Sequence, residues 1–296
     1  MAIAFDRAQR PLRQLRRSLK TVPATPLPED VHKLRTSSRR IEAIVAALSP
    51  AGDKLSRRVL KSIKPLRKAA GNVRDMDVLA ERAQRLPLEP HGESVASLLE
   101  ALRSLRKKHA EGLVEAIEHH RKQAREHLKQ YTAQIEKRRD SAPLAREAER
   151  RVRSAAASHA QELASWPALS ARNLHGFRLK VKELRTVLQL LANADSTLIR
   201  DLRAAKDQIG EWHDWLELGK TAAQALDTQQ HGALLALIRQ NHKQKLSVAL
   251  TAANALRERH LEGPLKKPPV SEPSSRSTPE RRSPASAVTG RPNQAA

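Results

Sequence analysis

Apolar residues recur along most of this chain at steps of three and four, the spacing that places side chains on one face of an α-helix. The pattern is clearest in two 18-residue blocks, residues 31–48 and 174–191, which lie 143 positions apart. Their apolar stripe consists of Val31, Leu34, Ile41, Val45 and Leu48 in the first block and Leu174, Phe177, Val181, Leu184, Leu188 and Leu191 in the second. Each block is predicted to be an amphipathic helix that packs by this stripe.

Both blocks also carry a cationic stripe in the same phase. Its members are His32, Arg35 and Arg39 in the first block and His175, Arg178, Lys182 and Arg185 in the second. At about 100° per residue, this stripe lies roughly 130° from the centre of the apolar one. A single basic run is usually a solvated face, but a face repeated in phase, histidine included, favours a functional surface.

Prolines and glycines predict where the other helices end. We expect a helix over residues 53–70 that Pro65 kinks or splits and Gly71 stops, followed by a helix over residues 72–86. Residues 93–140 contain no proline and predict either one long helix or two helices with a turn. Further helices are expected over residues 1–20 with an interruption at Pro11, over 143–166, over 197–209 with an end at Gly210, from residues 211–214 onward, and over 232–261.

The composition favours an all-α protein with an anionic partner. The chain of 296 residues is rich in Leu and Ala, and aromatic residues make up only 2% of it. Its formal net charge of +23 is self-repelling, so we expect a polyanion to bind. The absence of cysteine excludes disulfides and thiolate metal sites. No apolar run reaches the roughly 18 residues of a membrane span, and the first residues lack the apolar core of a secretory signal.

The repeat extends into the helix after each block when the second half is shifted by 139 positions. This shift aligns Gly71 with Gly210 and Asp75 with Asp214. It also matches Arg74, Lys61, Lys64 and Arg67 with His213, Arg200, Arg203 and Lys206. We infer an internal duplication with a pseudo-twofold arrangement.

Three parts of the chain differ in composition. Residues 1–27 form a basic N-terminal segment, and residues 28–262 form a helical domain with halves at about 28–140 and 141–262. Residues 263–296 hold seven of the seventeen prolines and little apolar surface, so we expect a disordered tail rich in Pro and Ser.

Three motifs in this order resemble the CHAD domain, the conserved histidine α-helical domain. They are HxxRxxxRR from His32 to Arg40, GNVRDMDVL from Gly71 to Leu79, and LHxFRxKVKxLR from Leu174 to Arg185. The resemblance covers roughly residues 28–262. It implies two antiparallel helical bundles, related by a pseudo-twofold, that face each other across a basic central channel.

The resemblance further implies binding of inorganic polyphosphate without turnover, with no metal, cofactor or catalytic residue. The expected ligands are His32, Arg35, Arg39, Arg40, Arg57, Lys61, Lys64, Arg74, His175, Arg178, Lys180, Lys182, Arg185, Arg200 and Arg203. Glu183 and Glu42 occupy the repeat positions of Arg40 and Arg185, so the two halves are expected to differ in charge. We see no β-rich segment and no ExExK pattern, which indicates a member without a CYTH-type triphosphatase domain. A cytoplasmic location is expected, with polyphosphate granules as a place of accumulation.

Non-specific binding of nucleic acid through the phosphate backbone is the main alternative, because it would use the same charge. However, the chain has six aromatic residues in total, which leaves few stacking platforms for single strands. It also shows no helix-turn-helix or zinc-finger spacing for reading a duplex. Polyphosphate is therefore the favoured partner.

Other interpretations are weaker. A metal hydrolase would need ligands such as His213 with Asp214, but the repeat accounts for that pair. Asp75 and Asp214 are expected to cap helix starts or to pair with cations rather than to act in catalysis. Trp212 and Trp215 are expected in the core. Residues 93–140 lack a strict heptad, so we expect packing in the bundle rather than a dimer seam.

Overall fold

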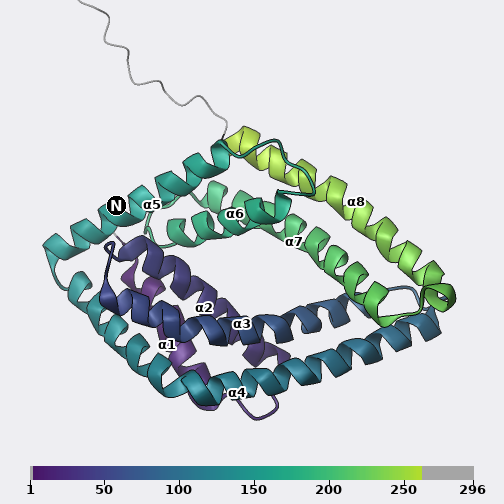
Figure 1. Cartoon of the computed structure of the whole chain (residues 1–296). Coiled ribbons are helices and arrows are strands. Elements are labelled where there is room, and N and C mark those ends of the chain that lie inside the picture. Colours follow the sequence, from purple (N-terminus) through teal and green to yellow (C-terminus); the bar gives the residue numbers. More distant parts are fainter. Residues whose placement is uncertain (1–2, 262–296) are drawn as a thin grey trace, which may run out of the picture. The chain divides into compact units, whose positions relative to one another are not determined.

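The computed structural model describes residues 3–261, and this part of the chain is α-helical, without a named strand (Figure 1). The helices are α1 (Phe5–Thr21), α2 (Pro28–Leu48), α3 (Lys54–Ala83), α4 (Gly92–Arg139), α5 (Ala142–Ala164), α6 (Leu174–Leu188), α7 (Ser196–Ala225) and α8 (Thr228–His260). The predicted all-α fold is confirmed. No helix within residues 3–261 is long and apolar enough to cross a membrane. The predicted disordered tail lies outside the described residues.

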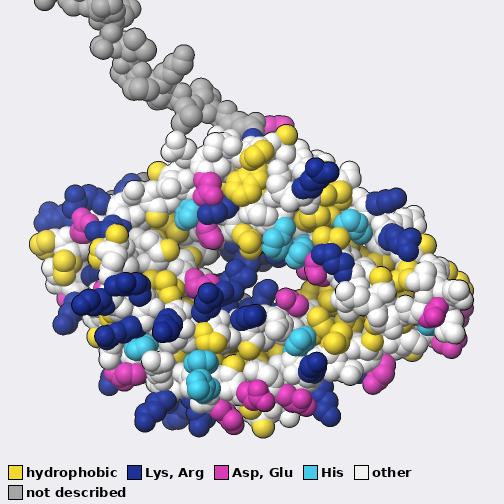
Figure 2. Space-filling model, viewed as in Figure 1, with side chains coloured by type: hydrophobic (Ala, Val, Ile, Leu, Met, Phe, Trp, Pro, Cys, Tyr) yellow, Lys and Arg dark blue, Asp and Glu magenta, His cyan; other side chains and the backbone are white. Residues whose placement is uncertain are grey.

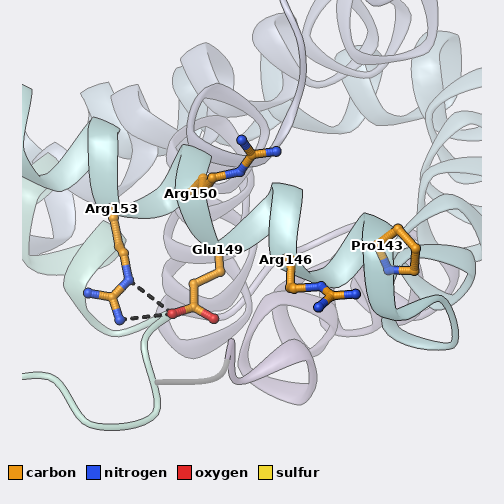
Figure 3. Close-up of a pocket in the computed structure, with 5 residues that line it drawn as sticks. All are labelled: Pro143, Arg146, Glu149, Arg150 and Arg153. Atoms are coloured by element: carbon orange, nitrogen blue, oxygen red, sulfur yellow. Dashed lines mark hydrogen bonds and ion pairs between the residues drawn. The ribbon is translucent and has the colours of Figure 1, made fainter.

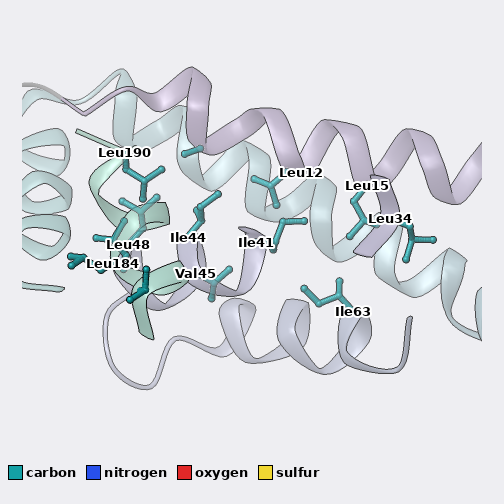
Figure 4. Close-up of a cluster of buried hydrophobic side chains, with 14 of the residues drawn as sticks. Leu12, Leu15, Leu34, Ile41, Ile44, Val45, Leu48, Ile63, Leu184 and Leu190 are labelled. Atoms are coloured by element: carbon teal, nitrogen blue, oxygen red, sulfur yellow. The ribbon is translucent and has the colours of Figure 1, made fainter. Parts of the chain in front are cut away.

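Two apolar clusters hold the helices together. In the larger one, Leu12 of α1, Ile41 of α2, Ile63 of α3 and Leu184 of α6 are at most 1% exposed (Figure 4). The smaller one includes side chains of α3, α4, α7 and α8, among them Leu79, Leu98, Trp215 and Leu235. It joins the α3–α4 pair to the α7–α8 pair where the two pairs converge (Figure 1). The two helix pairs are therefore joined by apolar packing at this end as well.

The apolar stripes of both blocks pack as predicted. In α2 the stripe is at most 2% exposed, and in α6 its members Leu174, Phe177, Val181 and Leu184 are at most 1% exposed. The second helix ends earlier than predicted, because Leu188 is its last residue and is only partly buried, and Leu191 lies beyond its end. The one polar residue on the first stripe, Ser38, is also buried, and its hydroxyl donates to the Leu34 carbonyl at 2.8 Å. This local bond satisfies the buried hydroxyl without a partner from another helix.

The helix breaks predicted at Pro11, Gly71 and Gly210 are wrong, and so is a split at Pro65. Helix α3 continues through Pro65 and Gly71, so the separate helix predicted over residues 72–86 does not exist. Helix α7 likewise continues through Gly210, and α1 through Pro11. An internal proline costs about 3 kcal/mol and a glycine about 1 kcal/mol. Burial of several apolar side chains, at about 1.5–3 kcal/mol each, outweighs these costs.

The remaining boundaries follow the proline pattern more closely. Residues 93–140, for which one or two helices were possible, form the single helix α4. Helix α8 begins a few residues before the predicted start and has non-helical backbone angles at His231. Helix α1 belongs to the basic N-terminal segment of the sequence, and it buries Leu12, Leu15 and Leu19 in the larger apolar cluster.

Candidate anion-binding groove

The cationic stripes of α2 and α6 face each other. Burial is the main cause that lowers the pKa of Arg35, and the charge of Arg178 adds to it while Asp75 opposes it. Burial likewise lowers the pKa of Arg178, with Arg39 adding to the effect. Figure 2 shows the molecule hollowed near the middle of one face, with Lys and Arg side chains gathered around the hollow. We call this hollow, between α2, α3, α6 and α7, the central groove.

Lys182 lies among the arginines of both stripes. Burial, followed by the charges of Arg178, Arg39 and Arg35, lowers the pKa of Lys182 to about 7. A fourth cation, Lys206 of α7, acts in the same direction. Within residues 3–261, no carboxylate forms an ion pair with the Lys182 amine. The groove therefore concentrates positive charge that the protein itself leaves largely uncompensated at this point.

Carboxylates compensate the cations at the part of the groove near α3 and the second half of α7. Arg35 donates to Asp75 at 3.3 Å. Arg82 of α3 binds Glu211 at 3.1 Å and Asp214 at 3.6 Å, and its guanidinium lies 5.6 Å from the Trp215 ring centroid. Burial raises the pKa of Asp214, and the charge of Arg178 opposes this increase. A cavity of about 140 Å³ adjoins these groups; it is lined by Arg74, Val78, Glu81, Arg82, Arg85 and Asp214.

Donors at the other part of the groove are left without partners. The Nε atoms of Arg39 and Arg185 are buried and have no hydrogen-bond partner within the described chain. Burial lowers the pKa of Arg185, and the nearby cations Arg203 and Arg40 add to this. Buried unpaired donors are costly, and an anion with several oxygens would satisfy them.

Two glycines lie next to the stripe arginines, and Gly210 leaves the room that its arginine needs. A Cβ atom built on Gly210 would lie only 2.7 Å from an Nη atom of Arg178. A Cβ atom on Gly71 would lie 3.8 Å from Nε of Arg35, an ordinary contact. Arg178 also donates through Nε to the Lys206 carbonyl at 3.3 Å. The repeat positions Gly71 and Gly210, predicted as helix ends, instead lie in continuous helices beneath equivalent arginines.

The two stripe histidines border the groove. Partial burial of His32, followed by the charges of Arg74 and Arg35, lowers its pKa. Burial and Arg178 lower the pKa of His175, whose ring centroid lies 4.1 Å from that of His213. Burial and the neighbouring His175 lower the pKa of His213 to about 4. All three rings therefore favour the neutral form at physiological pH.

Several predicted ligands lie apart from these stripes. Lys180 is directed toward α5, where it pairs with Glu162 at 3.1 Å, and it also pairs with Glu183 of its own helix at 3.3 Å. Arg200 pairs with Asp201 at 3.3 Å, near the end of α8. Exposed cations of α3 complete the predicted set; they are Arg57, Lys61 and Lys64. The structure thus brings together the two stripes, Arg40, Arg74 and Arg203, but not Lys180 or Arg200.

Sequence reasoning left Lys206 and His213 out of the site. Lys206 follows Arg203 by three residues on α7, so helical spacing could have identified it.

The helix starts predicted at Asp75 and Asp214 are wrong, because both lie inside helices; their predicted pairing with cations is confirmed. The predicted burial of the tryptophans at 212 and 215 is also confirmed. The glutamates at 42 and 183 pair with Arg67 and Lys180 respectively.

Other surfaces of the described chain offer less chemistry. An open pocket on α5 is lined by Pro143, Arg146, Glu149, Arg150 and Arg153 (Figure 3). Within it Arg153 pairs with Glu149 at 2.8 Å, while Arg150 pairs with Glu147 on the same helix. Residues 3–261 contain no group of three or more His, Cys, Asp or Glu side chains that could hold a metal ion.

Comparison with known proteins identifies related domains. The family model of the CHAD domain matches residues 7–223. The crystal structure of the CHAD domain from the plant Ricinus communis is similar, with a TM-score of 0.58 and 18% sequence identity. That likeness covers 87% of this chain and 92% of the plant chain. At this identity it shows a shared fold. Among curated proteins, none matches this chain.

Proposed function

Because the chain belongs to the CHAD family, we propose that its central groove binds inorganic polyphosphate and does not hydrolyse it. The observation that carries this proposal is the convergence of Arg35, Arg39, Arg178 and Lys182, whose pKa values are lowered first by burial and then by the charges of neighbouring arginines. Such mutual repulsion is relieved when an anion enters. The proposed binding needs no cofactor, and the protein would gather in the cytoplasm on stores of polyphosphate.

The length and chemistry of the groove suit a chain of phosphates. Arg178 and Arg185 are seven residues apart, which corresponds to about 10 Å along a helix and to a few phosphate units. Arginine offers a planar fork of donors to phosphate oxygens, and the buried Nε atoms of Arg39 and Arg185 have no other partner in the described chain. Polyphosphate carries no bases, so hydrogen bonds between its phosphate oxygens and these donors are sufficient for its recognition.

Nucleic acid fits the same groove less well. A duplex presents its phosphates on a convex surface, whereas the Arg35 side chain is only 30% exposed. Single strands are usually held by base stacking on aromatic rings, but Trp212 and Trp215 are 1% and 7% exposed. The exposed cations on the outside of the helices are the surface that favours non-specific nucleic-acid binding, which makes DNA the appropriate competitor.

The test is a competition between fluorescent long-chain polyphosphate and excess duplex DNA at about 150–200 mM salt. The double variant Arg35→Glu and Arg178→Glu should lose polyphosphate binding and keep its helical circular dichroism. The control variant Arg121→Glu and Arg125→Glu makes the same change of net charge at exposed positions of α4. We expect it to bind within about threefold of the wild type. Equal losses in both variants, or displacement by DNA, would overturn the proposal. Release of orthophosphate with added divalent metal would overturn the non-catalytic part.

A further inference from the structure

Lys182 differs from the arginines of the central groove because a lysine can lose its proton, and it differs from Lys206 because Lys206 is paired with Asp207. Arginine stays charged at any ordinary pH, whereas a buried lysine shifts its pKa readily. The amine faces Arg178 on its own helix, Arg35 and Arg39 on α2, and Lys206 on α7. When the groove is empty, deprotonation of Lys182 is therefore the simplest way to reduce the repulsion.

The carboxylates near the groove form ion pairs with cations other than Lys182. Asp207 pairs with Lys206 and Arg203, Asp75 with Arg35, and Asp214 with Arg82. On the α5 side of α6, Glu183 and Glu162 pair with Lys180. No acidic group of the described chain is thus left to hold a proton on Lys182, and an entering anion would be the first to do so.

We propose that Lys182 takes up a proton when a polyanion enters the central groove, so that protonation and binding are coupled. This inference rests on the proposed function and adds how the site is regulated. The Lys182 pKa of about 7 in the free protein supports it. An anion alongside moves that pKa back toward the ordinary lysine value of about 10.4. Between these two values the complex holds more protons than the free protein, so affinity falls as pH rises.

The other titrating groups near Lys182 act in a different pH range. His32, His175 and His213 all have lowered pKa values, so they are largely neutral above pH 7 in the free protein. Terminal phosphates of the ligand lose their second proton near pH 6 by analogy with phosphate esters. A long chain dilutes this contribution, and a variant that keeps the charge of residue 182 measures it directly.

The experiment is calorimetric titration of the full chain with long-chain polyphosphate at pH 8, in two buffers of different ionisation enthalpy. With a free pKa of about 7, the wild type should take up about 0.9 proton per site, and its affinity should weaken about 25-fold between pH 6.5 and 8.5. Lys182→Arg keeps the charge at both pH values and should show neither effect.

A second variant covers the case in which the larger arginine does not fit. Lys182→Met should take up no proton at residue 182 and bind more weakly than the wild type, and this deficit should shrink about 25-fold between pH 6.5 and 8.5, because at the higher pH the wild type must first protonate its amine. Equal proton uptake by the wild type and both variants would overturn the coupling while leaving polyphosphate binding intact. Absence of binding by the wild type at any pH would instead overturn the proposed function itself.

Discussion

Replacing Gly210 by alanine should displace the Arg178 guanidinium, because the new Cβ would lie 2.7 Å from its Nη atom and 3.2 Å from Nε. Carbon and nitrogen atoms cannot approach so closely, so the arginine must move. Its Nε bond to the Lys206 carbonyl, 3.3 Å long, would be lost or weakened. Gly71→Ala is the matched control, because its Cβ would meet Nε of Arg35 at an ordinary 3.8 Å.

The two variants should separate stability from binding. Alanine inside a helix is favoured over glycine by about 0.8–1.0 kcal/mol, which for a domain of this size raises Tm by roughly 2–4 °C. Gly71→Ala should show this gain in full. In Gly210→Ala, a lost hydrogen bond of about 0.5–1.5 kcal/mol should cancel most of it. Loss of one charge-assisted arginine–phosphate bond, about 1.5–3 kcal/mol, should weaken polyphosphate binding by roughly 10- to 100-fold.

Thermal unfolding and polyphosphate titration at fixed salt measure both effects. Gly71→Ala is expected to bind within about twofold of the wild type. If Gly210→Ala were as stable as Gly71→Ala and bound polyphosphate equally well, then Arg178 would not need its observed position. That result would refute the argument that the glycine exists to accommodate the arginine.

Three further predictions concern stability, pH and salt. Arg106→Ala removes the 2.6 Å partner of Asp77, whose side chain is 5% exposed, and should cost about 3 kcal/mol in urea unfolding; Arg103→Ala, at an exposed position, should cost less than about 0.5 kcal/mol. His213 has a folded pKa of about 4 against 6.5 unfolded, so the unfolded chain binds more protons between these values, and the free energy of unfolding should decrease as the pH is lowered from 6.5 to 4. His213→Asn should reduce this pH-dependent loss of unfolding free energy by roughly 1–2 kcal/mol, a figure that is discounted for solvent screening. An unchanged pH profile of stability would contradict the assignment of the loss to His213. The slope of log affinity against log salt should become shallower by about 0.7 in Arg178→Ala, and an unchanged slope would place this arginine outside the contact.

Helical periodicity correctly predicted the features that depend only on the direction in which a side chain leaves its own helix. The stripes of α2 and α6 are placed by 3.6-residue spacing alone, and both pack and face as that spacing requires. The same rule explains why Lys180 does not lie with the cationic stripe of α6. It belongs to the motif LHxFRxKVKxLR, but it lies two residues after Arg178, on nearly the opposite side of α6.

Local signals failed where packing between distant segments decides the outcome. Pro65 and Gly71 are helix breakers by propensity, but Ile63, Leu66 and Val73 on either side of them are fully buried. The sequence could not show that this burial would keep α3 continuous. It also could not show that α3 and α7 meet through the smaller apolar cluster, because that contact joins residues more than 100 positions apart.

The cations of the groove can lie close together despite their repulsion, because the helices that carry them are stabilised by packing outside the groove. Arg35 and Arg178 project from helices whose opposite faces are buried in the larger apolar cluster. At the other end, Arg82 links α3 to α7 by ion pairs beside the smaller cluster. Several kcal/mol of apolar burial at each end can therefore offset the cost of placing like charges together. A groove whose shape does not depend on its own charges loses little ordering free energy when an anion enters, so relief of the repulsion appears largely as affinity.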